Sequence, residues 1–354
     1  MSIVASVRLP RRPPLGAPSL ALALLAVLVA GAHAQQTPTG PGERPPFDTW
    51  LADLRAEALA RGIREEVLSK ALDGVQPVAT VLERDQTQPE FRLSLDGYLK
   101  RRLTTATVRT ARRELARHRA VLGRVQRASG VDPATLISVW GLESTFGRFS
   151  GVRPTIPTLA TLAFDERRGE LFRAELLEAL AILDRGEIEL ARMKGSWAGA
   201  MGQPQFMPSS FTKFAVDFDG DRRKDIWTSP ADIFGSIGNY LKVHGWTPGE
   251  RWGREVTIPA DAAPRVDALF HPRTTGCRAV RALSDPQPLD RWRAAGLRLR
   301  SGASVPAGTR SASLLQLSGR AFLVYPNYEA ILGYNCAHTY ALSVLLLADR
   351  VAGR

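Results

Sequence analysis

Apolar residues recur at helical spacing through most of the chain after residue 46. The pattern predicts helices at 47–62, 64–72, 104–129, 131–147, 158–164 and 169–184, a short helix from Pro208, and another from Pro230 to about His244. Ser229 stands before the last of these as its N-cap, and Asp232 occupies the third position, where an acid completes a capping box. This part of the chain is therefore predicted to be helical.

The pattern changes after Trp252. From there to about Gly319, apolar residues come in short runs separated by prolines, which favours short strands. Residues 321–325 are predicted to form a strand, and helical spacing returns over 327–352. The fold class predicted from these patterns is α+β and mainly helical. It has a small β-rich domain at 251–325 and a C-terminal helix at 326–354 that returns to the helical part.

The N-terminal 34 residues have the pattern of a secretory signal peptide. Three arginines precede the short apolar run Ser19–Gly31, and Ala32-His33-Ala34 forms a small-residue cleavage site before Gln35. No cysteine follows that site, so lipid attachment there is not expected. Residues 35–46 are rich in Pro, Gly and Thr and are predicted to be a linker. The sequence therefore predicts an exported, periplasmic and soluble protein.

Charge narrows the choice of partner. Removing the three arginines of the signal peptide leaves +9 of the formal net charge of +12. A basic exported protein suits a polyanion such as a cell-wall polymer. We find no helix-turn-helix, zinc-finger or RNP motif, so a nucleic acid is not expected. The arginine-rich helix at 104–129 is either a solvated face or a contact for an anionic substrate or membrane. Cys277 and Cys336 could form a disulfide in an oxidising compartment, although the sequence leaves that open.

The candidate catalytic acid lies on the helix that Asp132 caps, Pro133 begins and Gly147 ends. Glu143 shares an apolar face of this helix with Trp140. Apolar surroundings and the negative end of the helix both raise the pKa of a carboxyl, which favours a general acid. The other interpretation is an ordinary solvated glutamate in the last turn of a helix.

Residues 194–210 are rich in glycine and alanine and combine two kinds of side chain. Ser196, Gln203 and Gln205 supply neutral hydrogen-bonding groups. Trp197 and Phe206 supply flat apolar rings. Rings beside amides and hydroxyls suit a sugar, which has apolar faces and a polar rim. A buried packing turn is the alternative.

Two motifs make a specific resemblance. The run 140–147 reads WGLESTFG, and the run 199–209 reads GAMGQPQFMPS. Together they resemble the lytic murein transglycosylase B family, and the resemblance extends over 158–172, over 216–246 and to Tyr334-Asn335. It implies a lysozyme-like catalytic core at 131–250, an extra helical domain at 47–130 and the small β-rich domain.

The resemblance also implies an activity. The family cleaves the β-1,4 bond between N-acetylmuramic acid and N-acetylglucosamine in peptidoglycan without water, because the muramyl 6-hydroxyl attacks its own C1. Glu143 matches the single catalytic acid/base, and no cofactor is required for the chemistry. Positions that match substrate contacts are Ser196, Gln205, Tyr240 and Asn335, with Arg167 and Arg168 suited to anionic stem peptides. The expected partners are glycan strands and proteins of wall synthesis or remodelling.

Two alternatives to this activity stay open. A hydrolytic muramidase needs a second carboxyl about 5–10 Å from the first, and Asp165 and Glu166 are the nearest candidates. A non-catalytic peptidoglycan-binding protein would use the same residues without cleavage.

An acidic loop resembles the start of an EF-hand. Asp217, Asp219 and Asp221 stand at the first, third and fifth positions, the Arg223 carbonyl would be the next ligand, and Asp232 could close the site. Arg222 replaces the usual glycine, Thr228 stands where the closing glutamate is expected, and Asp232 comes later. The loop is therefore either a structural Ca²⁺ site, which relatives can have here, or a turn held by its own side chains.

Overall fold

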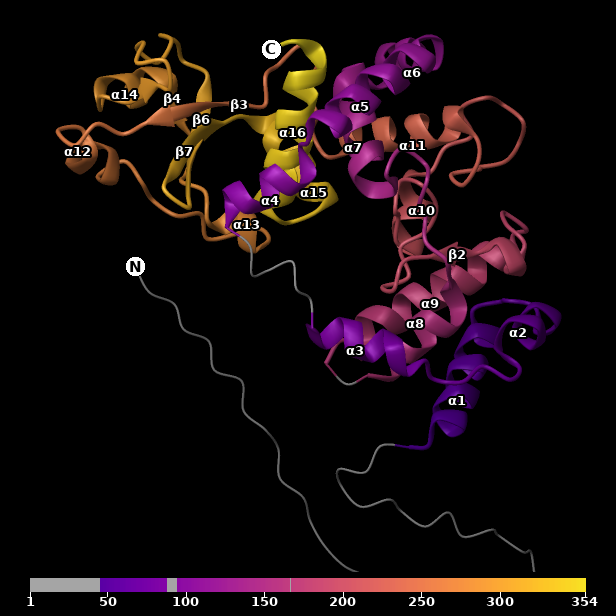
Figure 1. The fold of residues 1–354 in the computed structure, drawn as a ribbon. Coiled ribbons are helices and arrows are strands. Elements are labelled where there is room, and N and C mark those ends of the chain that lie inside the picture. Colours follow the sequence, from indigo (N-terminus) through magenta and orange to yellow (C-terminus); the bar gives the residue numbers. More distant parts are fainter. Residues whose placement is uncertain (1–44, 88–93, 166) are drawn as a thin grey trace, which may run out of the picture. The chain divides into compact units, whose positions relative to one another are not determined.

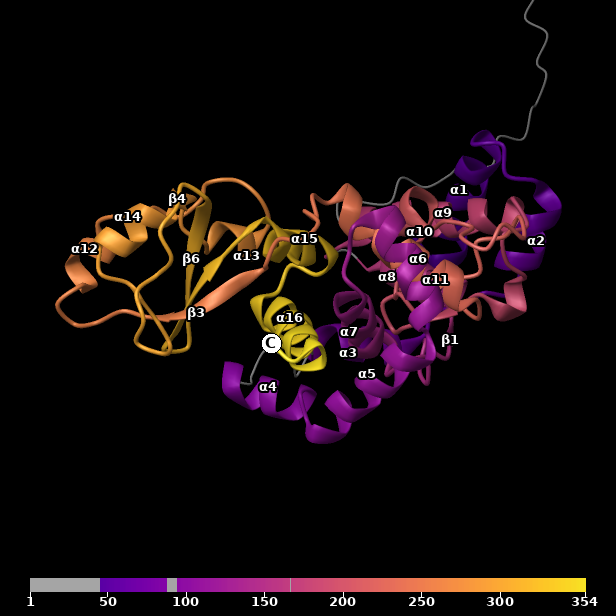
Figure 2. The same cartoon turned by 90° about the horizontal axis from the view of Figure 1, so that it is seen from above.

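The computed structural model describes residues 45–87, 94–165 and 167–354, and Pro45–Arg354 form one compact unit (Figures 1 and 2). The predicted signal peptide and most of the predicted linker lie outside the described residues. The helices are α1 (Phe47–Ala60), α2 (Glu65–Leu72), α3 (Ala79–Thr87), α4 (Leu95–Arg102), α5 (Thr105–Arg117), α6 (Arg119–Ser129), α7 (Pro133–Ser144), α8 (Thr155–Phe164), α9 (Gly169–Asp184), the 3-10 helix η2 (Leu190–Arg192), α10 (Pro208–Phe214), α11 (Pro230–Val243), α12 (Ala263–Asp267), α13 (Arg278–Arg281), α14 (Leu289–Ala294), α15 (Pro326–Tyr334) and α16 (His338–Ala352).

Helix α7 lies inside the helical part of the molecule. It packs against α16, α11, α5 and α6, and nearly all of its residues are buried. The predicted cap is confirmed, because the Asp132 side chain accepts a hydrogen bond from the Thr135 amide at 3.0 Å. Glu143 is the one ionisable residue of this helix. The helix that carries the candidate acid is therefore held from several sides.

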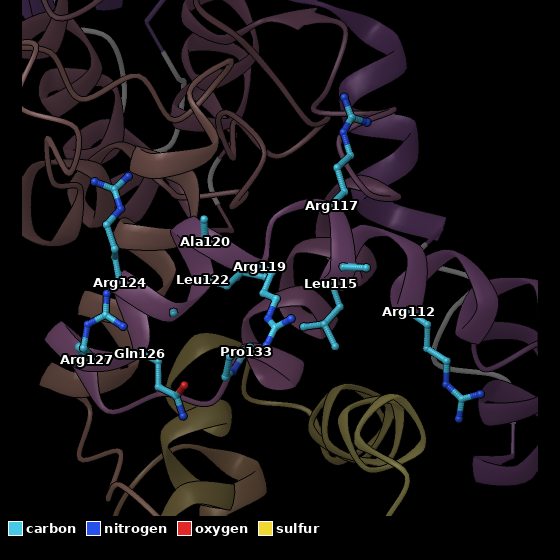
Figure 3. A pocket seen from close by; sticks show the side chains of 12 residues that line it. Arg112, Leu115, Arg117, Arg119, Ala120, Leu122, Arg124, Gln126, Arg127 and Pro133 are labelled. Carbon is cyan, nitrogen blue, oxygen red and sulfur yellow. The ribbon is translucent and has the colours of Figure 1, made fainter.

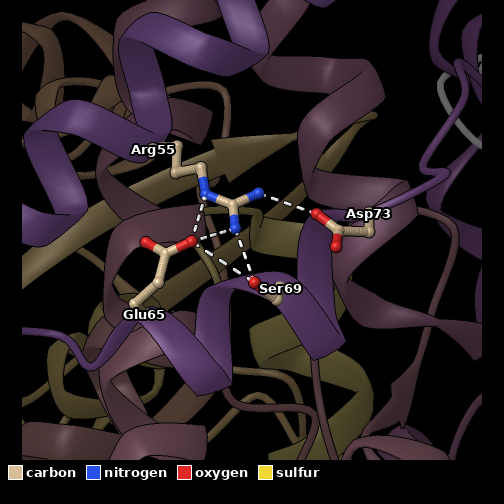
Figure 4. A network of polar contacts seen from close by, with 4 residues as sticks. All are labelled: Arg55, Glu65, Ser69 and Asp73. Atoms are coloured by element: carbon tan, nitrogen blue, oxygen red, sulfur yellow. Dashed lines mark hydrogen bonds and ion pairs between the residues drawn. The ribbon is translucent and has the colours of Figure 1, made fainter.

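A second group of helices packs around α8 and α9, which contact each other and, in turn, α1, α2 and α10. The range of α9 matches the prediction. Arg55 of α1 joins two members of this group, α1 and α2. Its guanidinium bonds to Glu65 and to the Ser69 hydroxyl of α2, and to Asp73 just beyond α2 at 2.7 Å (Figure 4). This network links α1 to α2.

The β-rich part is built on one antiparallel sheet, and a two-stranded ladder lies elsewhere. The sheet has the order β4-β6-β7-β3-β5, and the ladder pairs β1 with β2. The strands are β1 (Arg153–Pro154), β2 (Lys194–Gly195), β3 (Gly253–Thr257), β4 (Gln287–Pro288), β5 (Arg298–Leu299), β6 (Ser311–Leu317) and β7 (Arg320–Val324). The strand predicted at 321–325 is confirmed within one residue. The tight turn between β6 and β7 uses Ser318 and Gly319, both at positive φ, as two-residue hairpins require.

The sheet is buried on both faces. Along β7, Phe322 and Val324 join the large helical core, whereas Ala321 and Leu323 join a second cluster that includes Trp292. This follows from the period of two along a strand. The sheet therefore contributes to the large core as well as to its own cluster. The domain boundaries given from the sequence stay predictions.

The single helix predicted at 104–129 is wrong, because the chain bends at His118 between α5 and α6. His118 has φ −101° and ψ 14°, and its ring lies edge-on to Trp140 and Phe234 at centroid distances of 5.6 and 5.4 Å. Helical spacing continues through this bend, so only the packing of His118 shows it. The helices α3 and α4 were not predicted.

The single helix predicted at 327–352 is also interrupted, between Tyr334 and His338, with a bend of 119° between α15 and α16. Cys336 lies in this interruption and forms a disulfide with Cys277, with Cα atoms 6.3 Å apart. The pairing that the sequence left open is thus present. This bend brings Tyr334 and Tyr340 toward the same place.

Within the described part of the chain, no single helix is long and apolar enough to cross a membrane. The bent pair α15 and α16 passes that test by length and composition only. Many residues of both helices are buried in the protein core.

Candidate active site

Glu143 occupies the last turn of α7 and is part-buried. The helix ends directly after it, at Ser144, so the predicted end at Gly147 is late. Three consecutive residues then have left-handed backbone, with φ of 52° at Thr145, 59° at Phe146 and 76° at Gly147. Such a conformation is unfavourable for residues other than glycine. The chain therefore reverses sharply beside the carboxyl.

The residues of the WGLESTFG motif explain this reversal. A Cβ at Gly141 would lie 2.4 Å from the Phe146 ring, so glycine lets that ring fold back onto the helix. The Ser144 hydroxyl donates to the Trp140 carbonyl at 2.8 Å and accepts from the Gly147 amide at 3.0 Å. The motif thus encodes a helix end as well as the acid.

The same motif is joined to the glycine-rich segment through Gln203. The Trp140 Nε1 donates to Gln203 Oε1 at 2.6 Å, and Gln203 Nε2 donates to the Trp227 carbonyl at 2.6 Å. Both polar ends of one part-buried amide are therefore used to fix the two motifs against each other. The sequence indicated Gln203 as a hydrogen-bonding group for a sugar, whereas in the structure its amide bonds to Trp140 and Trp227.

Burial raises the pKa of Glu143 to about 7. Two neighbours act in the opposite direction and lower it, namely the Tyr340 hydroxyl and the charge of Arg102. Because desolvation is the largest cause, the carboxyl remains protonated to neutral pH, which is the state that a general acid needs. Glu143 therefore has the electrostatic property expected from its apolar helix.

Two tyrosines that the sequence did not identify as site residues lie beside Glu143. Tyr334 ends α15, and its hydroxyl donates to the Pro204 carbonyl at 2.6 Å. The Tyr340 hydroxyl of α16 influences the pKa of Glu143, but among the described residues it completes no well-formed hydrogen bond. Burial and the nearby Glu143 charge raise the pKa of both phenols. A signal for Tyr340 was its hydroxyl on an otherwise apolar helix face.

Tyr334 also links Glu143 to the glycine-rich segment. Its ring centroid lies 4.7 Å from that of Tyr240 and 5.8 Å from that of Phe206. Gln205 has φ 54°, and its Nε2 donates to the Ser150 and Gly202 carbonyls at 3.1 and 2.8 Å. The structure therefore brings Gln205, Phe206 and Tyr240 into one neighbourhood with the acid.

The prediction that Phe206 offers a ring face to a sugar is wrong. The side chain is only 2% exposed and belongs to the large core. Tyr240 is also buried at 8% exposure, and its hydroxyl donates to the Gly333 carbonyl at 2.7 Å. Burial raises the pKa of Tyr240 to about 12, so its hydroxyl stays protonated. Both side chains are therefore packed inside the protein next to the site.

The predicted contacts Ser196, Trp197 and Asn335 are more accessible. The Ser196 hydroxyl accepts from the amides of Ala198 and Ala200, both at 3.2 Å, so it shapes a turn. Trp197 follows it and is part-exposed. Asn335 is exposed at the end of α15, directly after Tyr334. Asn335 is thus the chain neighbour of Tyr334, which lies beside Glu143.

Arg167 and Arg168 lie in the corner between α8 and α9, and both are exposed. Arg167 pairs with Asp165, with Nε 3.4 Å from Oδ1, and the Arg168 guanidinium lies 5.0 Å from the Phe172 ring centroid. Asp165 is thereby engaged with an arginine, and Glu166 lies outside the described residues. The contacts of Arg167 and Arg168 are thus with residues of this same corner, Asp165 and Phe172.

The acidic loop gathers four carboxylates. Ligand atoms of Asp217, Asp219, Asp221 and Asp232 all lie within 4.8 Å of one another. Arg222 has φ 72°, so it adopts the left-handed conformation for which EF-hand loops use glycine. No contact of the described residues places the Arg223 carbonyl in this cluster, so that ligand stays a prediction.

Asp232 does not act as the reciprocal acid of a capping box. Its two carboxylate oxygens accept from the amides of Phe218 and Asp225, at 2.7 and 2.8 Å, across the loop. Ser229 caps α11 as predicted, accepting from the Asp232 amide at 3.3 Å. Burial raises the pKa of Asp232. A fully buried carboxylate facing three others fits a divalent cation, which would offset that burial.

The mainly helical α+β fold, with an acid at the end of a buried helix beside a glycine-rich segment, is of the lysozyme-like class. The family model described as "Transglycosylase SLT domain" matches residues 46–349. The chain therefore belongs to the transglycosylase SLT domain family.

The chain is similar to several known members. It is 34% identical over 238 residues to membrane-bound lytic murein transglycosylase B of Escherichia coli K12. The aligned segment covers 65% of this chain and 60% of the length of that protein. SltB3 of Pseudomonas aeruginosa, solved in complex with NAG-anhNAM-pentapeptide, has 41% identity and a TM-score of 0.78, covering 87% of this chain and 80% of that one. Slt35 of Escherichia coli, solved in complex with calcium, has 28% identity and a TM-score of 0.71, covering 87% and 93%.

Proposed function

We propose that this protein is a peptidoglycan lytic transglycosylase that leaves 1,6-anhydro-N-acetylmuramic acid ends. The observation that carries the proposal is the Glu143 carboxyl, whose pKa burial raises to about 7 at the end of the motif-bearing helix. The relatives are named as lytic transglycosylases, and one of them was solved with a fragment of this product type. These names and the geometry support the same reaction.

In the first step, the protonated Glu143 donates its proton to the oxygen that links N-acetylmuramic acid to N-acetylglucosamine. The C1–O bond breaks, and positive charge develops at C1 of the muramyl ring. The carboxylate left behind is stabilised by the Tyr340 hydroxyl and by the charge of Arg102, the two groups that lower its pKa. These neighbours therefore assist the ionised form after the acid has acted.

In the second step, the same carboxylate takes the proton of the muramyl 6-hydroxyl as that oxygen bonds to C1. The anhydro ring closes, Glu143 regains its proton, and no water is consumed. An intramolecular hydroxyl is an efficient nucleophile because it is already near C1. One carboxyl thus suffices, and we propose Ser196, Trp197, Gln205 and Asn335 as substrate contacts, with Tyr240 in support.

Mass spectrometry of muropeptides released from purified sacculi tests this proposal. We expect 1,6-anhydro ends, which borohydride does not reduce. The Glu143→Gln protein serves as the matched control and should release no muropeptides. Reducible ends would instead show a hydrolytic muramidase. Binding to sacculi with no release would show a non-catalytic wall-binding protein.

We also propose that the acidic loop holds one structural Ca²⁺ through Asp217, Asp219, Asp221 and Asp232. The convergence of the four carboxylates supports it, and a relative was solved with calcium. Calcium that binds only the folded state should raise the melting temperature. At a concentration 100 times Kd it adds about 2.7 kcal/mol to the unfolding free energy. Asp221→Asn should remove this shift, with Mg²⁺ as the control ion. If calcium raised the melting temperature of that variant equally, the loop would not be the calcium site and would be an acidic turn only.

We propose export to the periplasm, on the signal-peptide pattern of residues 1–34. N-terminal sequencing of the protein recovered from the periplasm should begin at Gln35. Recovery of the chain from Met1 in the cytoplasmic fraction would contradict this.

A further inference from the structure

The segment from α4 to α6 is the most basic part of the molecule. Residues 100–127 contain one lysine and nine arginines against a single acid, Glu114. Glu114 is buried at 7% exposure, and its Oε1 already accepts from Arg113 at 3.0 and 3.2 Å. The single acid within residues 100–127 therefore cannot neutralise this surface.

The bend at His118 makes a hollow of about 1080 Å³ along this surface, which we call the arginine groove. Its charged residues are Arg112, Arg117, Arg119, Arg124 and Arg127, all exposed. Figure 3 draws Arg119 near Leu115 and Pro133 at the centre, with Arg124 and Arg127 toward one end and Arg112 toward the other. Small side chains, such as those of Ala116 and Ala120, leave the space between the arginines open.

Most of this charge is available to a partner. Arg119 and Arg127 form no ion pair within the described part of the chain. Arg112 donates to the neutral Arg350 carbonyl at 2.6 Å, and the Arg124 guanidinium lies 5.7 Å from the Phe218 ring centroid. The exposed Arg117 guanidinium lies 3.7 Å from the carboxylate of Glu114, which is itself buried. The groove thus presents several guanidinium groups with little compensating negative charge.

The lining indicates which anion fits. Among the 12 described residues that line the groove there is no aromatic ring and no hydroxyl, and Gln126 is the single amide. Sugar recognition uses rings and hydroxyls, so a glycan is a poor match. Arginine forks bind phosphate, and the floor at Leu115, Ala116 and Ala120 is apolar. This combination matches a phosphate head group attached to an apolar chain.

We propose that the arginine groove docks the protein on a bilayer of anionic phospholipid, with the arginines on the phosphates and the apolar floor toward the glycerol region. Anionic membrane surfaces attract basic residues within about a Debye length. The proposal concerns where the enzyme resides and does not depend on the proposed cleavage reaction.

Vesicle co-sedimentation tests this docking. The chain from Gln35 is used, because the apolar run Ser19–Gly31 would bind vesicles by itself. We expect binding to phosphatidylcholine vesicles that contain phosphatidylglycerol, falling steeply with salt, and little binding to phosphatidylcholine alone. Arg119→Gln with Arg127→Gln should lower the partition coefficient by about an order of magnitude. Cleavage of soluble glycan fragments should be unchanged in this variant.

The matched control is Arg281→Gln with Arg293→Gln, which removes the same charge from exposed positions in the β-rich part. Binding in this control should remain close to that of the parent protein, because charges farther than a Debye length from the bilayer contribute little. Equal losses in both variants would show attraction by net charge alone and overturn the assignment. So would absence of binding to the anionic vesicles. Loss of sacculus binding in the groove variant of the Glu143→Gln protein, with vesicle binding intact, would assign the groove to a wall polymer instead.

Discussion

Two buried helices each carry a glutamate on an inward face, and the two carboxyls are treated differently. Glu175 of α9 is 7% exposed, and both of its oxygens accept hydrogen bonds from Ser209, from the amide at 2.8 Å and from the hydroxyl at 2.7 Å. Glu143 of α7 has no comparable pair of donors among the described residues, and burial raises its pKa to about 7. Both oxygens of Glu175 therefore have hydrogen-bond donors, whereas the Glu143 carboxyl is favoured in its protonated form.

The difference shows that burial alone does not make a catalytic acid. Ser209 lies in the first turn of α10, where helix amides are free to donate and the helix dipole favours an anion. Glu175 therefore joins α9 to α10. Glu143 instead ends its own helix, where the dipole disfavours negative charge, and its neighbours are mainly aromatic. The local supply of donors separates a structural carboxylate from a candidate acid.

The largest expected effect concerns activity. Glu143→Gln should lower the rate of muropeptide release by roughly 10²- to 10⁴-fold, because it removes the transferable proton while keeping the shape of the side chain. Glu175→Gln is the matched substitution and should stay within a few-fold of the parent, measured well below its melting temperature. Initial rates on sacculi measure both. A Glu143→Gln protein that retains normal release would remove Glu143 from the mechanism.

The comparison reverses for stability. Glu175→Gln places an amide donor against the donors of Ser209 and should cost about 1.5–3 kcal/mol of unfolding free energy. Glu143→Gln should be neutral or stabilising at neutral pH, because it removes a carboxyl that burial disfavours as an anion. Urea unfolding at pH 7 gives both values. If the two variants lose similar stability, the proposed contrast between the carboxyls fails.

The pH dependence of stability should also differ. The pKa of Glu143 is raised in the folded state from 4.5 to about 7, so the folded protein holds a proton that the unfolded chain releases. Its contribution is present below pH 4.5 and is lost as pH rises toward 7, by about 2–3 kcal/mol. Relative to Glu143→Gln, the parent should therefore weaken between pH 4.5 and 7. Parallel stability profiles for the two proteins would contradict the raised pKa.

Local sequence signals predicted the helix of Glu143 well, because its cap and its first turn are local. Asp132 and Pro133 act as expected, and α9 has the predicted range. The end of α7 was placed too late, since the left-handed turn begins at Thr145, a residue type that rarely adopts it. That turn depends on Phe146 packing over Gly141, which is a tertiary contact.

Several features that the sequence missed depend on contacts between distant segments. The bend at His118 comes from rings of α7 and α11, and the bend after Tyr334 contains a cysteine that is bonded to Cys277. Phe206 was predicted to stack on a sugar because its ring stands beside amides and hydroxyls in the sequence, yet it is buried. Tyr334 and Tyr340 reach Glu143 only because of the second bend. Residue types and motifs indicated the chemistry, whereas these partners needed the fold.

The smallest expected effect concerns the partner of the acid. The Tyr340 hydroxyl lowers the pKa of Glu143, so Tyr340→Phe should raise that pKa and move the alkaline limb of the kcat/KM profile to higher pH. The rate at pH 5–6 should fall about two- to tenfold, because the carboxylate formed in the first step loses a stabilising hydroxyl.

Tyr334→Phe is the matched control for this shift. The Tyr334 hydroxyl donates to the Pro204 carbonyl, so its loss removes a bond to the backbone and leaves the hydroxyl beside Glu143 in place. Its pH profile should keep the parent position even if the rate falls. Equal shifts in the two variants would mean that the Tyr340 hydroxyl has no special role, because the Tyr334 hydroxyl would then tune Glu143 to the same extent. An unshifted Tyr340→Phe profile would mean that the limb belongs to another group.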